Sequence, residues 1–203
     1  MYKYRRIIGV GVTVFSMVGI VILLNVLFSA PPVFRGTTYA EPFPVAAEIV
    51  LDQGNGIPFR LEDQRGRIVL LFFGFTSCPD VCPTTLADLN SVLAKIGDNS
   101  KYVQVVFVSV DPERDTPEKM QQYAGRFNPT FVGLSGSVGE LEPIWQAYGI
   151  YREIVRADAG LDYSVNHTAR ITLVDQMGNM RLSYGFQTPP TDIAHDIEIL
   201  LDD

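Results

Sequence analysis

Two strongly apolar runs, residues 68–75 and 103–110, constrain the fold of this chain more than any other feature of its sequence. The first run, IVLLFFGF, shows no alternation of polar and apolar residues, which indicates a central strand covered on both faces. The second run is rich in β-branched residues, as buried strands are. Between them, residues 83–96 carry apolar side chains at helical spacing. This order predicts two parallel strands joined by a right-handed crossover.

The flanking segments extend this unit into a larger α/β domain. Alternation at 59–61 and a turn at 63–66 predict a hairpin that leads into the first run. Downstream we expect a helix that opens at Thr116-Pro117, a strand at 131–134, a helix that opens with the capping box Ser137–Glu140, strands at 168–174 and 180–184, and a helix at 191–201. A βαβ unit followed by a β-hairpin and a helix is the thioredoxin-like plan. We therefore predict a thioredoxin-like α/β fold, with a central mixed sheet flanked by helices and an extra N-terminal β-hairpin.

The N-terminus predicts a single transmembrane helix. Residues 7–28 carry no charge and are long enough to cross a bilayer as a helix, which needs about 20 residues. A cleaved signal peptide has a shorter apolar core. The basic tail at 1–6 places the N-terminus in the cytoplasm by the positive-inside rule. We expect an inner- or plasma-membrane anchor at 7–28, a Pro-rich linker at 29–48 and a periplasmic or other extracytoplasmic domain at 49–203.

The charge balance argues against one broad class of function. The chain carries 16 Lys and Arg against 23 Asp and Glu, for a formal net charge of −7. Nucleic-acid binding needs a basic surface. We therefore expect no nucleic-acid partner.

Cys78 and Cys82 are the only cysteines and follow the first apolar run directly. They fall where a strand gives way to a helix, and ligands collect at the carboxyl ends of strands in such sheets. A stabilising disulfide would suit an exported domain, but so short a loop removes little chain entropy. A chemical function therefore explains the closely spaced cysteines better than a stabilising disulfide does. The spacing leaves two kinds open, a redox-active dithiol or a pair of thiolate ligands to one metal ion.

His167 adds a nitrogen ligand to the second interpretation. It immediately precedes the strand predicted at 168–174, and in a thioredoxin-like fold the loop that enters this strand faces the cysteine pair. Two thiolates and one imidazole suit Cu(I) or Cu(II), and also Zn(II) with one open position. The alternative is a loop histidine with a hydrogen-bonding role. His195, the only other histidine, lies off the apolar face of the last predicted helix and is expected to be exposed.

An acidic loop, Asp111 to Asp115, follows the second apolar run and should lie at the same edge of the sheet as the cysteines. One interpretation is local, in which Asp111-Pro112 turns the chain and Asp115 or Thr116 caps the next helix. The other is functional, a loop that supports the metal site or contacts a partner. Both can hold together.

Three segments resemble motifs of the Sco (SenC) family, copper chaperones for cytochrome c oxidase assembly. Residues 73–86, FGFTSCPDVCPTTL, look like the family's cysteine signature. Residues 108–117, VSVDPERDTP, resemble its second motif, and residues 163–168, YSVNHT, resemble the segment that carries its third metal ligand. The segments occur in the family's order, and the similarity runs from about residue 49 to the C-terminus.

The resemblance implies one copper ion, Cu(I) or Cu(II), bound by Cys78, Cys82 and His167. It links Asp111 and Asp115 to copper handling or partner contact. It implies a membrane-anchored metallochaperone that delivers copper to the Cu(A) centre in subunit II of cytochrome c oxidase, and it leaves open whether the chain is also an enzyme, a thiol-disulfide reductase.

The alternative is a thiol-disulfide oxidoreductase that uses Cys78 and Cys82 to reduce the cysteines of the oxidase copper site. Both functions need a thioredoxin-like reductant, since a disulfide cannot bind copper. A copper-donor chaperone is a further expected partner. A peroxiredoxin-like peroxidase is disfavoured, because Thr76 stands two residues before Cys78 where such enzymes have a threonine three residues before.

Overall fold

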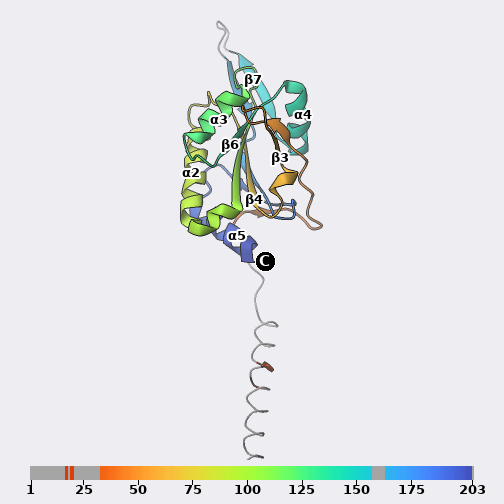
Figure 1. Ribbon diagram of the computed structural model, residues 1–203, viewed down its shortest axis with the longest axis vertical. Coiled ribbons are helices and arrows are strands. Elements are labelled where there is room, and N and C mark those ends of the chain that lie inside the picture. The colour runs from red at the N-terminus through yellow and green to blue at the C-terminus, as the bar shows by residue number, and fades with distance from the viewer. Residues whose placement is uncertain (1–16, 18, 21–32, 157–162, 203) are drawn as a thin grey trace, which may run out of the picture. The chain divides into compact units, whose positions relative to one another are not determined.

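Strand β4, Ile68–Gly74, lies at the centre of the sheet (Figure 1). It pairs in parallel with β5, Val103–Ser109, and antiparallel with β9, Arg170–Val174. Every residue of β4 and β5 is buried. The crossover between them is helix α2, Val81–Ile96, followed by the 3-10 helix η2, Gly97–Tyr102. The two apolar runs are therefore neighbouring parallel strands, as predicted.

The central sheet is mixed and has the strand order β1-β10-β9-β4-β5-β6. Its remaining strands are β1, Thr37–Thr38, β6, Val132–Leu134, and β10, Met180–Gly185. The extra N-terminal hairpin is present as β2, Val50–Asp52, with β3, Pro58–Arg60. Its turn is not the predicted one, because Glu62–Gln64 forms the 3-10 helix η1 between the hairpin and β4.

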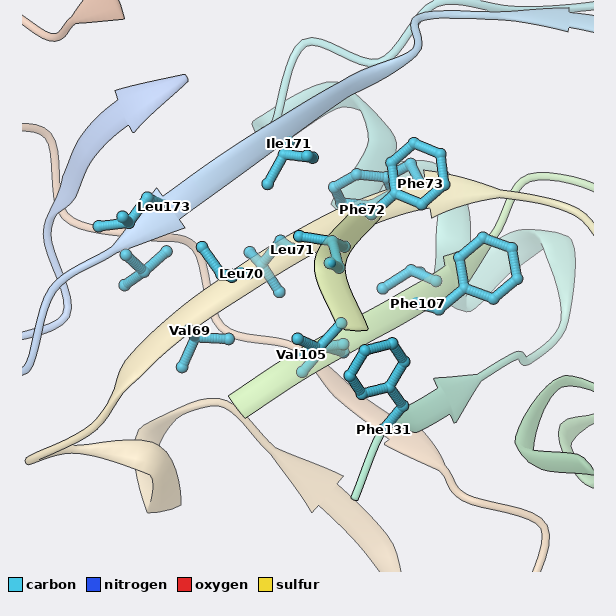
Figure 2. Close-up of a cluster of buried hydrophobic side chains, with 14 of the residues drawn as sticks. Val69, Leu70, Leu71, Phe72, Phe73, Val105, Phe107, Phe131, Ile171 and Leu173 are labelled. Atoms are coloured by element: carbon cyan, nitrogen blue, oxygen red, sulfur yellow. The ribbon is translucent and has the colours of Figure 1, made fainter. Parts of the chain in front are cut away.

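Helices cover both faces of the sheet. Besides α2 they are α3, Pro117–Gly125, α4, Val138–Ala147, and α5, Pro190–Asp202, and α2 packs beside α5. Successive side chains of a strand point to opposite faces. Phe73 contacts Tyr148 at the end of α4, with ring centroids 5.5 Å apart. Its neighbour Phe72 points the other way and stacks on Phe107 of β5 at 5.6 Å. Figure 2 shows Phe72, Phe73 and Phe107 within the cluster of buried side chains around β4, β5 and β9.

A second hairpin, β7 with β8, is absent from the sequence-based prediction. Strand β7, Arg152–Arg156, pairs with β8, Tyr163–His167, and neither joins the main sheet. His167 is therefore the last residue of a strand that the sequence did not predict, and the strand predicted at 168–174 begins at Arg170. Half of the residues of these two strands are exposed, so they lack the apolar runs that reveal β4 and β5.

The structure describes residues 17, 19–20, 33–156 and 163–202. The basic tail predicted at 1–6 and nearly all of the anchor predicted at 7–28 lie outside these residues. In the part of the chain that is described, no helix is both long enough and apolar enough to span a membrane.

The described part of the predicted linker, residues 33–48, differs from the expectation of a free tether. The compact unit that contains the folded domain begins at Phe34, well before residue 49. Thr37 and Thr38 pair with β10, and Ala46 is buried. The physical reason is Asp196 of α5, a fully buried carboxylate. It accepts hydrogen bonds from the backbone N–H groups of Arg35 at 2.9 Å and Gly36 at 2.8 Å, and from the Tyr184 hydroxyl at 3.2 Å.

We expect Asp196→Ala to lower the free energy of unfolding by at least about 3 kcal/mol, because it strips a charged acceptor from four donors, the fourth being His195 Nδ1 at 3.0 Å. The matched control is Asp192→Ala on the same helix, which removes only a half-exposed ion pair with Arg35 and should cost less than about 1 kcal/mol. Urea denaturation of both variants measures the difference. Equal losses would show that Asp196 does not hold the N-terminal segment.

Candidate metal centre

The predicted ligands and the acidic loop gather where β4 and β5 end. Strand β4 stops at Gly74 and β5 stops at the paired residue Ser109. The Val110 N–H then donates to the Gly74 carbonyl at 2.8 Å, so the two strand ends remain joined one residue further on. The cysteine loop and the acidic loop consequently leave the sheet side by side.

Gly74 allows α2 to approach the sheet closely. A Cβ atom at this position would lie 2.7 Å from the Cys82 Sγ and 2.7 Å from the ring of Phe107. Both distances are too short for any side chain. Glycine at the end of β4 therefore places Cys82 directly against the sheet, where it is fully buried.

Cys78 and Cys82 form a polarised pair at the start of α2. Cys78 precedes the helix, and Cys82 lies in its first turn with its N–H 3.3 Å from the Cys78 Sγ. Asp80 is the N-cap residue but its side chain makes no capping hydrogen bond, so the sulfur takes that role. The two cysteines form no disulfide in this structure.

The pair divides into one thiolate and one thiol. The Cys82 side chain donates a hydrogen bond to Cys78, and with the N–H groups of Cys82, Asp80 and Val81 this lowers the pKa of Cys78 to about 6 against the opposing effect of burial. The same hydrogen bond, together with burial, raises the pKa of Cys82. At neutral pH the pair therefore carries one negative charge, on the more exposed sulfur.

His167 ends strand β8 opposite Arg152 of β7. Its Nδ1 lies 3.1 Å from the Thr168 carbonyl oxygen and therefore donates to it, which leaves the Nε2 lone pair free. Burial lowers the pKa of His167, so the ring is neutral at pH 7, the form that binds metals. Its ring meets that of Phe75 edge to face, with centroids 5.8 Å apart.

The structure thus brings the two cysteines together and places His167 against Phe75, the residue that opens the cysteine loop. It does not close the three into one coordination sphere. Among the described residues, no group of three His, Cys, Asp or Glu side chains is close enough to hold a metal ion.

Asp115 fixes the cysteine loop. It is buried, and it accepts hydrogen bonds from the Thr76 N–H at 3.0 Å, the Thr76 hydroxyl at 2.5 Å and the Ser109 hydroxyl at 3.1 Å. Lys119 lies 3.4 Å away as its counter-charge. Of the two predicted helix caps, Thr116 is the one observed, since it accepts from the Lys119 N–H at the start of α3.

Asp111 faces the β7–β8 hairpin. It is fully buried and accepts from the Tyr163 hydroxyl at 2.6 Å and from Arg114 Nε at 2.5 Å. The predictions from sequence singled out neither partner. Tyr163 stands four residues before His167 and Arg114 lies inside the acidic loop, but only the tertiary structure brings them together.

Comparisons with known proteins show which family this chain resembles. The family model described as SCO1/SenC matches residues 37–202. A Stutzerimonas stutzeri protein named for copper binding is 36% identical over 133 residues, which are 65% of this chain and 64% of that protein.

Two solved structures are similar over most of the described chain. Copper-bound ScoI of Bradyrhizobium japonicum is 36% identical, with a TM-score of 0.70 over 77% of this chain and 99% of that one. The apo Sco1 protein of Thermus thermophilus is 39% identical, with a TM-score of 0.75 over 84% of this chain and 99% of that one. The chain therefore belongs to the Sco (SCO1/SenC) family, which has a thioredoxin-like fold and whose members bind copper and take part in cytochrome c oxidase assembly.

Proposed function

We propose that this protein is a copper metallochaperone that binds one copper ion through Cys78, Cys82 and His167 and delivers it to the Cu(A) centre in subunit II of cytochrome c oxidase. The observation that carries the proposal is the chemistry of the donor set. A thiolate at a helix start, a neighbouring thiol and a neutral imidazole with a free Nε2 all lie along one edge of the sheet. Soft thiolates and imidazole are ligands that copper prefers.

Copper capture changes this donor set in two ways. Cys82 releases its proton, because only the thiolate is a metal ligand. The negative charge of the neighbouring Cys78 thiolate opposes this proton loss, whereas the positive charge of copper favours it. His167 and the cysteines also approach more closely than they lie here. Three ligands leave the ion open to an incoming ligand. Thiolates of the acceptor can then replace Cys78 and Cys82 one at a time, so that copper passes on without being released into water.

The place of action follows from the same proposal. We assign residues 1–6 to a cytoplasmic tail and 7–28 to the anchor, with the copper-binding domain in the periplasmic or extracytoplasmic space where the Cu(A) centre is assembled. That compartment is oxidising, so a thioredoxin-like reductant keeps the cysteines reduced. A copper-donor chaperone supplies the ion.

A copper-transfer assay tests the proposed function. Two equivalents of the reduced chain, each loaded with one Cu(I) ion, are mixed with one equivalent of the copper-free soluble fragment of oxidase subunit II, and removal of one electron by ferricyanide gives the mixed-valence Cu(A) centre, which is followed by its absorption spectrum. We expect the centre to form, and His167→Ala to lower its yield at least about tenfold through the lost ligand. His195→Gln, which removes the other imidazole and keeps a hydrogen-bond donor beside the buried Asp196, is the matched control and should transfer normally. Equal transfer by both variants would refute the chaperone mechanism.

The low pKa of Cys78 favours a second candidate function, reduction of the partner's cysteines. The Cys78 thiolate attacks one sulfur of a partner disulfide, and the other partner sulfur leaves as thiolate. Cys82 then loses its proton and attacks Cys78, which frees the second partner thiolate. The partner gains two electrons and the chain ends with a Cys78–Cys82 disulfide. Loss of the Cys78 charge in the mixed disulfide removes a main cause of the raised Cys82 pKa, which prepares the second step.

We expect Cys78 to react with iodoacetamide with a midpoint near pH 6, because the thiolate is the reactive form and its fraction rises with pH through the pKa of about 6. Cys82 should stay unmodified at pH 7. In Cys82→Ala the donating thiol is gone, so the midpoint of Cys78 should move up by at least about one unit toward the ordinary value near 8.5. Alkylation rates measured by mass spectrometry give both midpoints. A midpoint near 8.5 in the unaltered chain would contradict the thiolate–thiol pair.

A further inference from the structure

The hairpin that carries His167 has weak support of its own. Strands β7 and β8 pair only with each other, and the described chain adds no third strand to them. A two-stranded hairpin is marginally stable by itself in water. The position of His167 relative to the cysteines therefore depends on the side chains that attach this hairpin to the domain.

One attachment is made by β8. The Tyr163 hydroxyl donates to the fully buried Asp111 at 2.6 Å, while Arg114 Nε donates to the other oxygen of the same carboxylate at 2.5 Å. Arg114 also donates from Nη1 to the Tyr163 carbonyl at 3.0 Å. Both oxygens of the buried carboxylate are thus satisfied, one of them by the hairpin itself. Removing a hydrogen bond to a charged acceptor in such a place is costly.

The Arg114 guanidinium also packs against aromatic rings on both sides of the site. Its central carbon lies 3.8 Å from the centroid of the Tyr163 ring and 5.8 Å from that of Phe75. Phe75 in turn contacts the ring of His167. Arg114 therefore connects the start of β8, the cysteine loop and, through Phe75, the end of β8.

The other strand is attached to the same loop. Arg152 of β7 donates from Nε to the Val110 carbonyl at 2.5 Å and from Nη2 to Glu113 at 2.7 Å. Arg152 is the residue paired with His167 across the hairpin. Residues 110–114 thus hold both strands, and the next residue, Asp115, holds Thr76 of the cysteine loop.

We propose that Arg114 and Tyr163 are positioning residues that, through Asp111, hold the β7–β8 hairpin and so set the distance between His167 and the cysteine pair. This inference rests on the proposed copper site. The contacts of Asp111, Arg114 and Tyr163 form a latch whose effect on copper passes entirely through His167. Two separate claims follow. The first is that the latch stabilises the hairpin in the copper-free chain, and the second is that it raises copper affinity.

Amide hydrogen exchange of the full chain in detergent, reduced and free of copper, tests the first claim. Tyr163→Phe keeps the ring under Arg114 and removes only the hydroxyl that Asp111 accepts. We expect the amides of β7 and β8 to exchange at least about tenfold faster, as the loss of a hydrogen bond to a charged group implies. Tyr151→Phe is the matched control, because the Tyr151 side chain is mostly exposed. Unchanged exchange in Tyr163→Phe overturns the latch.

A double-mutant cycle on Cu(I) affinity tests the second claim. Tyr163→Phe and Arg114→Gln are each compared with the unaltered chain, and again in the His167→Ala background. We expect each to weaken binding by at least about fivefold alone, and to have no further effect once His167 is gone. A loss of the same size in both backgrounds shows that the two residues act on the cysteines or the fold, which overturns the proposal. If the unaltered chain binds no copper, the proposed function fails, and the exchange experiment alone decides whether the latch holds the hairpin.

Discussion

The parallel pairing of β4 with β5 is the constraint on which the rest of the structure depends. Seven consecutive residues of each strand pair in register, all are buried, and both strands end at the same level. Parallel pairing brings both carboxyl ends to one edge, so the cysteine loop and the acidic loop start as neighbours. Glycine at the last position of β4 then lets Cys82 pack against the sheet. The site is thus a consequence of how two apolar strands end.

Two buried carboxylates convert this adjacency into a defined geometry. Burying a carboxylate is costly unless hydrogen bonds satisfy its oxygens. Asp115 meets this condition with donors from Thr76 and Ser109, and Asp111 meets it with Arg114 and Tyr163. One acidic loop therefore holds the cysteine loop on one side and the His167 hairpin on the other. The family resemblance links both residues to copper handling or to contact with a partner protein. In the structure, Asp115 binds the cysteine loop and Asp111 binds the β7–β8 hairpin.

Those parts of the fold that local pattern determines could be predicted from the sequence. The apolar runs, the mixed sheet and the thioredoxin-like plan were predictable because the elements carry their own periodicity or cap, whereas the N-terminal hairpin forms around a turn other than the predicted one. The β7–β8 hairpin was not, since its strands are half exposed and its stability comes from Asp111 and Arg152 contacts distant in sequence. The Pro-rich segment from residue 34 resembled a tether, but a buried carboxylate 160 residues later binds its backbone. For the site, the residue types and their order in the sequence pointed to the cysteines and His167. The contact between the rings of Phe75 and His167 could be seen only in the tertiary structure.

An anaerobic copper titration of the reduced chain beside its His167→Ala variant tests the central claim most directly. We expect one tightly bound equivalent in the unaltered chain, and binding weakened at least about tenfold when the imidazole ligand is removed, with both thiols still free. The chain oxidised to the Cys78–Cys82 disulfide should bind no copper tightly. Binding that is indifferent to His167, or no stoichiometric binding at all, would contradict the two-sulfur, one-nitrogen site and leave thiol-disulfide exchange as the function of the pair.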